Sequence, residues 1–584
     1  MKTFFSIIRD VVCLGVVAFV LGSTAMAQNY EQVAPKQPPE KAGEGNVVNG
    51  TSAIASGHGT TDVMVAHLKA LVFLSDIHEL KRGGVKNSPA INPGTVPFAL
   101  RSDFQSVVEP FIGQPVTLKS LGELSRAIVA FYREHDRPVV NVFVPEQNIT
   151  NGIVQIVVAE SRVGQVNATG AKYFSNDQLR HEMQLRTDGP ISGDEVRGDL
   201  NWINRNPFRQ SDILFSPGEV PGTTDVMLRT QDRFPVRFFA GYEDSGNQLT
   251  GDGRFFTGFN YGDLFGVGQQ LSYQYTTGSD ANKFYAHSGT YIIPLPWHHE
   301  LTFFGLYSEA NASVAMPLTT SGVSWQTSMR YEIPLPGTQA FQHSVLGGFD
   351  FKQSNNDLEF GGSTISNIYT DVAQFVLGYQ ASYLDDFGST SATATGFWSP
   401  GGLTGTPANT DTSYVATRAG ATANYAYGQL TLHRVTRLPW DFTWSVKALY
   451  QVSDANLLPS EEIGLGGYQT VRGYDEREAN GDDGFLVSTE VATPPVSPGQ
   501  FIGLKQATDQ LQFLGFVDYG GTSLHHATPS DVNPNTNLLG VGPGVRYNIS
   551  PYVAVRFDYG FQMIDTGFDT RHNSRGHVGV VVSY

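Results

Sequence analysis

Apolar and polar residues alternate along the C-terminal part of the chain, from residue 234 to residue 584. Residues 324–333 and 553–562 show the alternation most clearly. Their apolar positions are Trp325, Met329, Tyr331, Ile333, Val553, Val555, Phe557, Tyr559 and Phe561. Successive side chains of a β-strand point to opposite faces, so the pattern predicts strands with lipid on one side and water on the other. A soluble β-sandwich shows the same alternation and is the alternative fold.

The connections between these segments are of two kinds. Short proline-containing turns recur at residues 293–296, 333–336, 438–439, 494–495 and 550–551. Longer stretches rich in glycine, serine, asparagine and aspartate, such as residues 399–412, lie between them. Short turns on one rim and long loops on the other are typical of outer-membrane barrels. At roughly 22 residues for a strand and its connection, residues 233–584 predict a mainly β fold, a transmembrane antiparallel β-barrel of about sixteen strands.

The first residues have the pattern of a secretory signal peptide. Two basic residues precede an apolar run over residues 11–21, and Ala25 and Ala27 mark a cleavage site of the A-x-A type. The run is shorter than the ~18 residues that a membrane helix needs, and it lacks the polar face of an amphipathic helix. We therefore expect residues 1–27 to be removed and the mature chain to leave the cytoplasm. This favours the barrel over the soluble sandwich.

Composition excludes several classes of function. The only cysteine, Cys13, lies in the segment that we expect to be removed, which excludes disulfides and thiolate catalysis. The net charge of −17 argues against a nucleic-acid partner, because phosphate binding requires a basic surface. The histidines at residues 298–299 and 525–526 lack the spacing of a zinc helix, and the glycine-rich residues 540–544 precede no helix. We expect no cofactor, no metal and no enzymatic activity.

The region before the alternating strands has a different character. Residues 28–66 are rich in proline, glycine and glutamate and predict a flexible linker. Residues 62–80 include apolar residues at helical spacing. Residues 67–163 then predict a small α/β module. Its expected elements are a strand at residues 70–74, a helix at residues 118–134 and strands at residues 139–144 and 153–158.

A second and shorter α/β module follows at residues 164–232. Its pattern repeats the plan of the first module in less space. The expected elements are strands at residues 166–169, 212–215 and 224–229 and helices at residues 176–184 and 193–204. Two such modules ahead of a barrel imply that the chain has a part outside the membrane.

Two short motifs stand out within the strand-rich part. The first is V-R-G-Y in an aspartate-rich stretch, formed by Val471, Arg472, Gly473 and Tyr474. The second is F-x-D-x-G on an alternating stretch, formed by Phe516, Asp518 and Gly520. A guanidinium in a narrow pore needs a fixed carboxylate, and an arginine–aspartate pair is planar and bidentate. We therefore expect Arg472 to meet Asp518. Loss of Arg472 would release the loop and leave Asp518 in a water-filled lumen, where it can hydrate. The alternative is an exposed loop arginine that never meets this aspartate.

The order and spacing of these motifs resemble the paired signature of barrels that secrete or insert other proteins. The chain is similar to the two-partner secretion transporters, the TpsB or haemolysin secretion-activation family. The resemblance implies that the V-R-G-Y loop enters the lumen from the extracellular side, with Arg472 at its tip and Asp518 on the inner wall. It also implies polypeptide-transport-associated (POTRA) domains at residues 67–163 and 164–232. Family members often have a helix that plugs the pore, and residues 62–80 are the candidate here.

This resemblance implies an outer-membrane pore of a Gram-negative bacterium. Periplasmic POTRA domains would recognise an unfolded exoprotein, and the barrel would secrete it without ATP. The partner is then a large secreted protein of the TpsA type, and outer-membrane lipid surrounds what we expect to be a monomer. A barrel-assembly insertase of the same superfamily is one alternative, although room for two POTRA domains favours secretion. A porin or surface adhesin is another, and porins lack the V-R-G-Y loop.

The end of the chain has its own pattern. Val578, Val580 and Val582 alternate up to the terminal aromatic residue, Tyr584. This resembles the signal by which the barrel-assembly machinery recognises an outer-membrane strand. We therefore expect that machinery to be a second protein partner.

Overall fold

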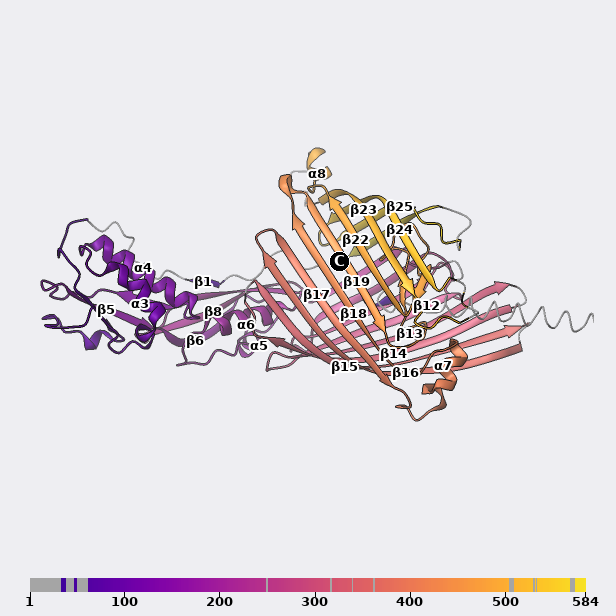
Figure 1. The fold of residues 1–584 in the computed structure, drawn as a ribbon, viewed down its shortest axis with the longest axis horizontal. Coiled ribbons are helices and arrows are strands. Elements are labelled where there is room, and N and C mark those ends of the chain that lie inside the picture. Colours follow the sequence, from indigo (N-terminus) through magenta and orange to yellow (C-terminus); the bar gives the residue numbers. More distant parts are fainter. Residues whose placement is uncertain are drawn as a thin grey trace, which may run out of the picture. The chain divides into compact units, whose positions relative to one another are not determined.

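A computed structural model describes residues 33–37, 47–49, 61–247, 250–315, 318–338, 340–360, 363–503, 509–528, 531, 533–567 and 573–584. The chain divides into two compact units, and each is described by itself (Figure 1). One is Glu40–Phe234, and the other joins Met1–Pro39 to Pro235–Tyr584. The predicted signal peptide and its cleavage site, Ala25 and Ala27, lie outside the described residues. Among the described helices, none is long and apolar enough to span a membrane.

The first α/β module has a four-stranded sheet in the order β3-β2-β5-β4. Its strands are β2 (Ala70–Leu74), β3 (Ile91–Asn92), β4 (Val140–Phe143) and β5 (Ile153–Glu160). Strands β3, β2 and β5 are parallel, and β4 is antiparallel to β5. Its helices are η1 (Ile77–Glu79), η2 (Pro97–Leu100), α3 (Ser102–Val108), η3 (Glu109–Phe111) and α4 (Leu118–Glu134). The predicted strand at residues 70–74 and helix at residues 118–134 are confirmed.

The helix considered for residues 62–80 is wrong. Strand β2 and the short helix η1 occupy that segment instead. All five residues of β2 are buried, because the strand lies between β3 and β5 with side chains packed on both faces. A run of consecutive apolar residues suits such a central strand better than an amphipathic helix. The plug candidate from the sequence is therefore part of the first module.

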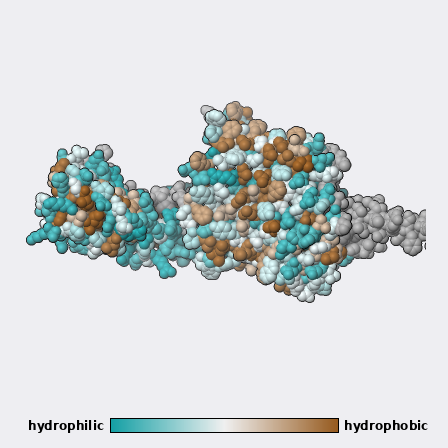
Figure 2. Space-filling model, in the orientation of Figure 1, coloured by the Kyte–Doolittle hydropathy of each residue, from teal (hydrophilic) through white to brown (hydrophobic). Residues whose placement is uncertain are grey.

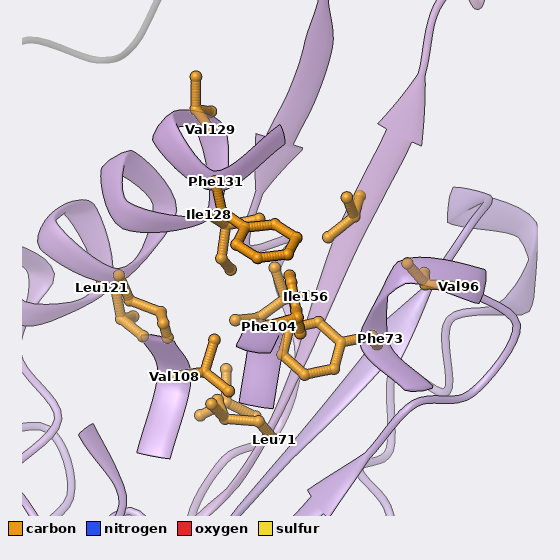
Figure 3. Packing of buried hydrophobic residues seen from close by; sticks show 14 of the residues in the cluster. Leu71, Phe73, Val96, Phe104, Val108, Leu121, Ile128, Val129, Phe131 and Ile156 are labelled. Atoms are coloured by element: carbon orange, nitrogen blue, oxygen red, sulfur yellow. The ribbon is translucent and has the colours of Figure 1, made fainter. Parts of the chain in front are cut away.

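Helices α3 and α4 pack on one face of this sheet. Helix α4 begins at a capping box, in which the Thr117 side chain accepts from Ser120 N and the Ser120 hydroxyl accepts from Thr117 N. The core between helices and sheet contains three phenylalanines (Figure 3). Phe104 meets Phe73 and Phe131 edge to face, with ring centroids 5.1 and 5.2 Å apart. The first module therefore has a hydrophobic core of its own, in which aromatic rings supply much of the buried area.

The second module also has a four-stranded sheet, in the order β1-β7-β8-β6. Its elements are β1 (Val47–Asn49), β6 (Arg162–Thr169), α5 (Asn176–His181), α6 (Gly193–Asn204), β7 (Arg209–Pro217) and β8 (Thr223–Asp232). The predicted helix at residues 193–204 is confirmed, and the predicted strands are longer than expected. Strand β1 comes from the segment predicted as a flexible linker and pairs in parallel with β7. That part of the linker therefore belongs to the sheet.

The C-terminal part is a closed barrel of sixteen antiparallel strands in the described residues, as the period of two predicts (Figure 1). They are β9 (Val236–Glu243), β10 (Arg254–Leu264), β11 (Gln269–Gly278), β12 (Phe284–Pro294), β13 (Glu300–Ala315), β14 (Leu318–Leu335), β15 (Phe341–Phe360), β16 (Ser363–Asp385), β17 (Gly388–Pro400), β18 (Asn424–Arg437), β19 (Thr443–Ser453), β22 (Asp483–Ala492), β23 (Asp509–Ser523), β24 (Asn535–Ile549), β25 (Val553–Gln562) and β26 (Ser574–Ser583). The last strand pairs with the first, which closes the wall.

The two faces of the wall differ as the alternation predicts. On β25, Phe557, Tyr559 and Phe561 are exposed on the outside, whereas Asp558 and Gly560 face inward and are buried. Hydrophobic residues spread across the outer wall of the barrel (Figure 2). A polar interior with an apolar exterior is the arrangement of a membrane barrel, whereas a soluble sandwich buries its apolar face.

The two rims also differ. One rim has short turns, such as residues 295–299, 386–387 and 550–552, with the short helices η5 (Pro439–Asp441) and α8 (Pro498–Phe501). Exposed aromatic side chains gather on these turns: Phe265, Trp297, Phe387, Trp440 and Tyr552. The other rim has long loops, including residues 401–423 with η4 (Pro407–Asn409) and α7 (Asp411–Thr417), and residues 454–482. Aromatic rings of this kind prefer the membrane–water interface.

Residues 33–37 lie inside the barrel. The carbonyl oxygen of Val33 accepts from the Ser288 hydroxyl, and Asn260 Nδ2 donates to the carbonyl oxygen of Lys36 at 3.1 Å. Lys36 Nζ also lies 3.0 Å from a carboxylate oxygen of Glu243. These three barrel residues are buried on the inner face. This part of the predicted flexible linker is therefore bound to the lumen wall.

Candidate functional site

The loop between β19 and β22, residues 454–482, folds back into the barrel. Strands β20 (Ile463–Leu465) and β21 (Ala479–Gly481) pair to form its stem. Val471, Arg472 and Tyr474 are buried at its tip. A cluster of apolar side chains holds the loop against the wall: Ile463, Leu465, Val471, Tyr474, Ala479, Leu486 and Leu538. We call residues 454–482 the inner loop.

Arg472 and Asp518 meet inside the barrel. Arg472 Nε donates to Asp518 Oδ2 at 2.7 Å, and Nη2 donates to Oδ1 at 2.8 Å. The backbone N–H of Arg472 also donates to Oδ2 at 3.1 Å. This is the planar, bidentate geometry expected for an arginine–aspartate pair. The structure thus brings the two motifs together and disfavours an exposed loop arginine.

With the inner loop docked, Asp518 does not reach water. Its side chain is fully buried, and the guanidinium of Arg472 is only 3% exposed. The Ser488 hydroxyl donates to Asp518 Oδ1 at 2.6 Å, and the docked loop covers the rest. A buried carboxylate needs such partners, because its hydration has been lost. If the loop stayed docked, removal of Arg472 would leave an uncompensated buried charge, which favours release of the loop.

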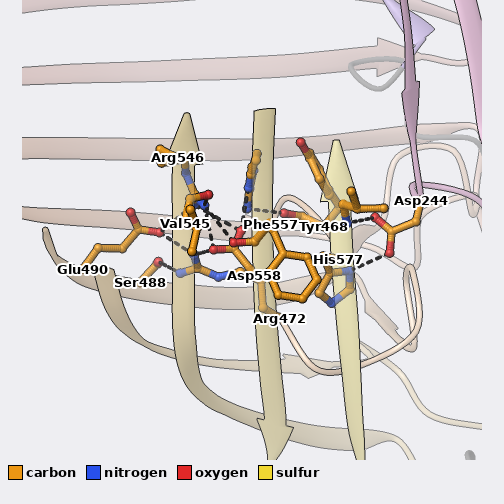
Figure 4. Close-up of polar contacts among 12 residues, drawn as sticks. Asp244, Tyr468, Arg472, Ser488, Glu490, Val545, Arg546, Phe557, Asp558 and His577 are labelled. Atoms are coloured by element: carbon orange, nitrogen blue, oxygen red, sulfur yellow. Dashed lines mark hydrogen bonds and ion pairs between the residues drawn. The ribbon is translucent and has the colours of Figure 1, made fainter. Parts of the chain in front are cut away.

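Two further carboxylates complete the surroundings of Arg472 (Figure 4). Arg472 Nη1 donates to Glu490 and lies 3.6 Å from Asp558 Oδ1. Asp558 is itself bound by Arg546, at 2.8 and 3.1 Å, and by Arg556 Nε at 2.7 Å. The cluster contains three arginines and three carboxylates, so its charges balance. No sequence motif marks Glu490 or Asp558, whose only signal is an inward position in the alternation.

The other residues of the two motifs shape the contact. The Phe516 ring lies under the guanidinium of Arg472, 3.6 Å from its centroid. A side chain at Gly520 would meet Leu465 Cδ1 and Phe485 O, both at 2.8 Å. The Tyr474 hydroxyl donates to the carbonyl of Ile564 at 2.8 Å and accepts from Leu539 N at 3.2 Å. The two motifs therefore meet through the contacts of Arg472 with both Asp518 and Phe516.

Gly473 permits the turn at the loop tip. Its φ of 102° lies in a region that side chains rarely adopt, and its backbone touches the backbone of Gly560 on β25. A Cβ atom at Gly560 would overlap Gly473 N. Two glycines thus allow the loop and the wall to approach backbone to backbone.

The remaining sites predicted from sequence lie apart from this cluster. Val578, Val580 and Val582 lie on β26 facing outward, and the Tyr584 side chain is 92% exposed. Residues 298–299 lie in a short turn, residues 525–526 in a loop, and residues 540–544 in β24. No group of residues suited to hold a metal ion occurs in the described ranges.

The fold and this cluster define a class of protein: outer-membrane transporter barrels preceded by POTRA domains. The family described as haemolysin secretion/activation protein ShlB/FhaC/HecB matches residues 222–547, and the ShlB-type POTRA domain matches residues 93–161. The first match covers more than half of the chain, so the chain belongs to the haemolysin secretion/activation family. This confirms the resemblance to two-partner secretion transporters.

Relatives of the chain include named transporters. It is 22% identical over 452 residues to the heme/hemopexin transporter protein HuxB of Haemophilus influenzae strain 86-028NP, covering 76% of this chain and 77% of that protein. It is 21% identical over 406 residues to the outer membrane transporter CdiB of Escherichia coli O6:K15:H31 strain 536, covering 66% and 65%. The solved structure of CdiB from Escherichia coli matches 99% of this chain and 98% of that one, with a TM-score of 0.70 at 16% identity. At this identity the structural match concerns the fold.

Proposed function

We propose that this protein secretes one large unfolded exoprotein across the outer membrane without ATP. In this proposal the two α/β modules lie in the periplasm as POTRA domains and recognise the client, and the barrel is the exit. The relatives named as transporters and the family membership support this reading. The short-turn rim then faces the periplasm and the long-loop rim faces the outside, which fits their lengths.

The observation that carries the proposal is the inner loop docked on the lumen wall. The loop binds the wall through the Arg472 cluster, and residues 33–37 line another part of the wall. In this proposal, a segment that closes a protein exit at rest must be one that the client can displace. Polar contacts to a wall suit a removable obstruction, because water replaces them when they break.

The modules offer edges for an extended client. In the sheet orders of the described residues, β4 ends the first sheet and β6 ends the second. An extended peptide adds to such an edge through main-chain hydrogen bonds, which tolerate many sequences. The other edge of the second sheet, at β7, is covered by β1. Folding of the client outside the cell then removes extended chain from the exit and gives transport its direction.

Deletion of residues 67–232 tests this proposal. The barrel should still insert, since its outer wall is untouched, and should still migrate as a heat-modifiable band. The culture medium should lose the single large protein that the parent strain releases, as measured by mass spectrometry. Parental levels of that protein would contradict the capture role. In the insertase alternative, removal of the whole chain would instead lower several unrelated barrels and leave the medium unchanged.

A further inference from the structure

His577 lies between the tip of the inner loop and the first strand of the barrel. It is fully buried on the inner face of β26, the last strand (Figure 4). The backbone N–H of Gly473 donates to His577 Nε2 at 3.0 Å. That nitrogen therefore accepts, and the proton of a neutral ring must be on Nδ1. His577 Nδ1 lies 3.3 Å from Asp244 Oδ2, although the angles fall outside those of a hydrogen bond.

Asp244 follows β9 directly and extends its pairing with β26. The pairing of these two strands, which we call the seam, has five residue pairs and ends at Glu243 opposite Gly579. The pairing of β25 with β26 has nine residue pairs. Beyond the seam, Asp244 N donates to Val578 O at 3.1 Å, and Asp244 Oδ1 accepts from Val578 N at 2.9 Å. Asp244 thus extends the hydrogen bonding of the seam beyond its last residue pair, with its backbone N–H and its side chain.

The rest of β26 also fits the inner loop. Arg575 forms an ion pair with Asp475 of the loop, and a side chain at Gly579 would overlap the Tyr468 hydroxyl. On the neighbouring strand, Gln562 Nε2 donates to the carbonyl oxygen of Gly473 at 2.8 Å. Both polar backbone groups of Gly473 are therefore bound by wall side chains. These contacts lie on strands β25 and β26, whereas Asp518 lies on β23.

We propose that His577 and Asp244 are positioning residues that couple docking of the inner loop to closure of the seam. Asp244 fixes the tautomer of His577, and that tautomer offers Nε2 to the loop tip. Separation of β9 from β26 moves Asp244 away and removes this control. Release of the loop tip leaves His577 free to leave Asp244. The proposal rests on the proposed function only for its effect on secretion.

Four substitutions separate this role from simple packing. Asp244→Asn keeps an oxygen for Val578 N but places an amide donor toward His577 Nδ1, which favours the tautomer that repels Gly473 N–H. His577→Asn places its amide nitrogen near Asp244 but cannot reach Gly473. His577→Gln places an oxygen near the original Nε2 position and keeps the loop contact. His577→Ala loses both contacts.

Loop docking can be measured without secretion. Val471 is fully buried in the docked loop, so Val471→Cys in a Cys13→Ser chain reports undocking by maleimide labelling of the detergent-purified barrel. Asp244→Asn, His577→Asn and His577→Ala should label about tenfold faster than the parent, because a buried donor loses its acceptor. His577→Gln should label at nearly the parental rate. Arg472→Ala serves as the undocked reference, and heat-modifiable migration confirms a folded barrel.

The outcomes decide the proposal. Equal labelling of the parent, Asp244→Asn and His577→Asn would overturn it, as would fast labelling of His577→Gln. Faster labelling with unchanged secretion would support control of loop docking by the seam residues Asp244 and His577 and count against the role of the loop in transport.

Discussion

Arg472 and Asp518 share three hydrogen bonds at a place where neither side chain is more than 3% exposed. Arg472 lies on the inner loop, and Asp518 lies 46 residues later in the sequence, on strand β23. The pair is bidentate, and the arginine is also bound to Glu490. The arginine therefore has spare partners, whereas the aspartate depends on Arg472 and the Ser488 hydroxyl. This asymmetry predicts different costs for removing each residue.

Arg472→Ala should undock the inner loop and abolish most secretion. Breaking a buried ion pair from one side typically costs about 3–5 kcal/mol when the other charge stays buried, and release of the loop avoids this cost by exposing Asp518 to the lumen. Asp518→Ala should have a smaller effect, since Arg472 keeps Glu490 and Asp558. The double variant should be no worse than Arg472→Ala, because it also removes the carboxylate that would lose its partner and because residues of one cluster are not additive. Maleimide labelling of Val471→Cys and client release measure both effects.

A matched control lies near the short-turn rim. Arg434 forms a bidentate pair with Asp385 at 2.7 and 3.0 Å, and both side chains are more than a quarter exposed. Arg434→Ala should leave labelling and secretion near parental values, because an exposed pair contributes little. If the double variant of Arg472 and Asp518 showed the full sum of two independent losses, the shared contact would have no functional meaning.

Gly560→Ala should mimic loss of Arg472 although it removes no charge. A Cβ atom at Gly560 would overlap the loop backbone at Gly473, so the tip has no room to dock. Gly576→Ala, on the neighbouring strand, is the control, because the nearest heavy atom to its Cβ is 3.6 Å away. We expect at least a several-fold difference in labelling rate between these variants. Similar rates would show that the loop docks without this close approach.

Tyr584 should be needed for assembly through its aromatic ring. Its backbone pairs with Phe238 at 2.9 and 3.0 Å, while its side chain points away from the protein. Tyr584→Ala keeps the backbone pair and should still reduce the amount of folded barrel in the membrane, with export to the periplasm intact. Tyr584→Phe should be neutral. Equal levels of heat-modifiable barrel in all three strains would exclude the ring as an assembly signal.

Asp199 should make the second module less stable as pH rises. Burial raises the pKa of this carboxyl to about 7, although the N–H groups of Gln184 and Leu185 donate to it. Between the unfolded pKa of 3.8 and this value, the folded state keeps a proton that the unfolded state has lost. Stability therefore falls across this range, by up to about 4 kcal/mol, and stays low above it.

Asp199→Asn should remove this dependence. Hydrogen exchange of β8 amides in the full-length protein, corrected for intrinsic rates at pH 5 and pH 8, measures it. Asp212→Asn, on β7 and partnered by Arg229, is the control and should keep the parental profile. A parental protection that does not fall with pH would rule out a protonated Asp199 in the folded module.

The sequence predicted the main contact of the site but not its surroundings. Arg472 and Asp518 were found because each belongs to a motif with several defined residues. Glu490, Asp558 and His577 occupy inward positions of an alternating strand, which many lumen residues share. They come together at one point of the wall only because the consecutive strands from β22 through β26 pair side by side. Contacts in this part of the wall join residues up to 334 positions apart in the sequence, as between Val578 and Asp244.

The linker shows a second limit. Residues 28–66 have no apolar period, so nothing local predicts that residues 33–37 bind Ser288 and Asn260 or that Val47–Asn49 form a strand. The bonds to Ser288 and Asn260 and the strand ladder use backbone groups, which any sequence supplies, and the Lys36 side chain adds an ion pair with Glu243. Which segments bind at these places depends on the positions that the lumen wall offers and on the edge that β7 offers in the second sheet.

The sequence by itself determined that the C-terminal part crosses a membrane as strands, because successive residues of such a strand must face lipid and water in turn. It also determined which rim has short turns, since proline and glycine act locally on the backbone. The tertiary structure alone decided which loop turns inward, how the three arginines share three carboxylates, and that Asp518 is dry. These follow from strand register and barrel closure, which depend on all sixteen strands together.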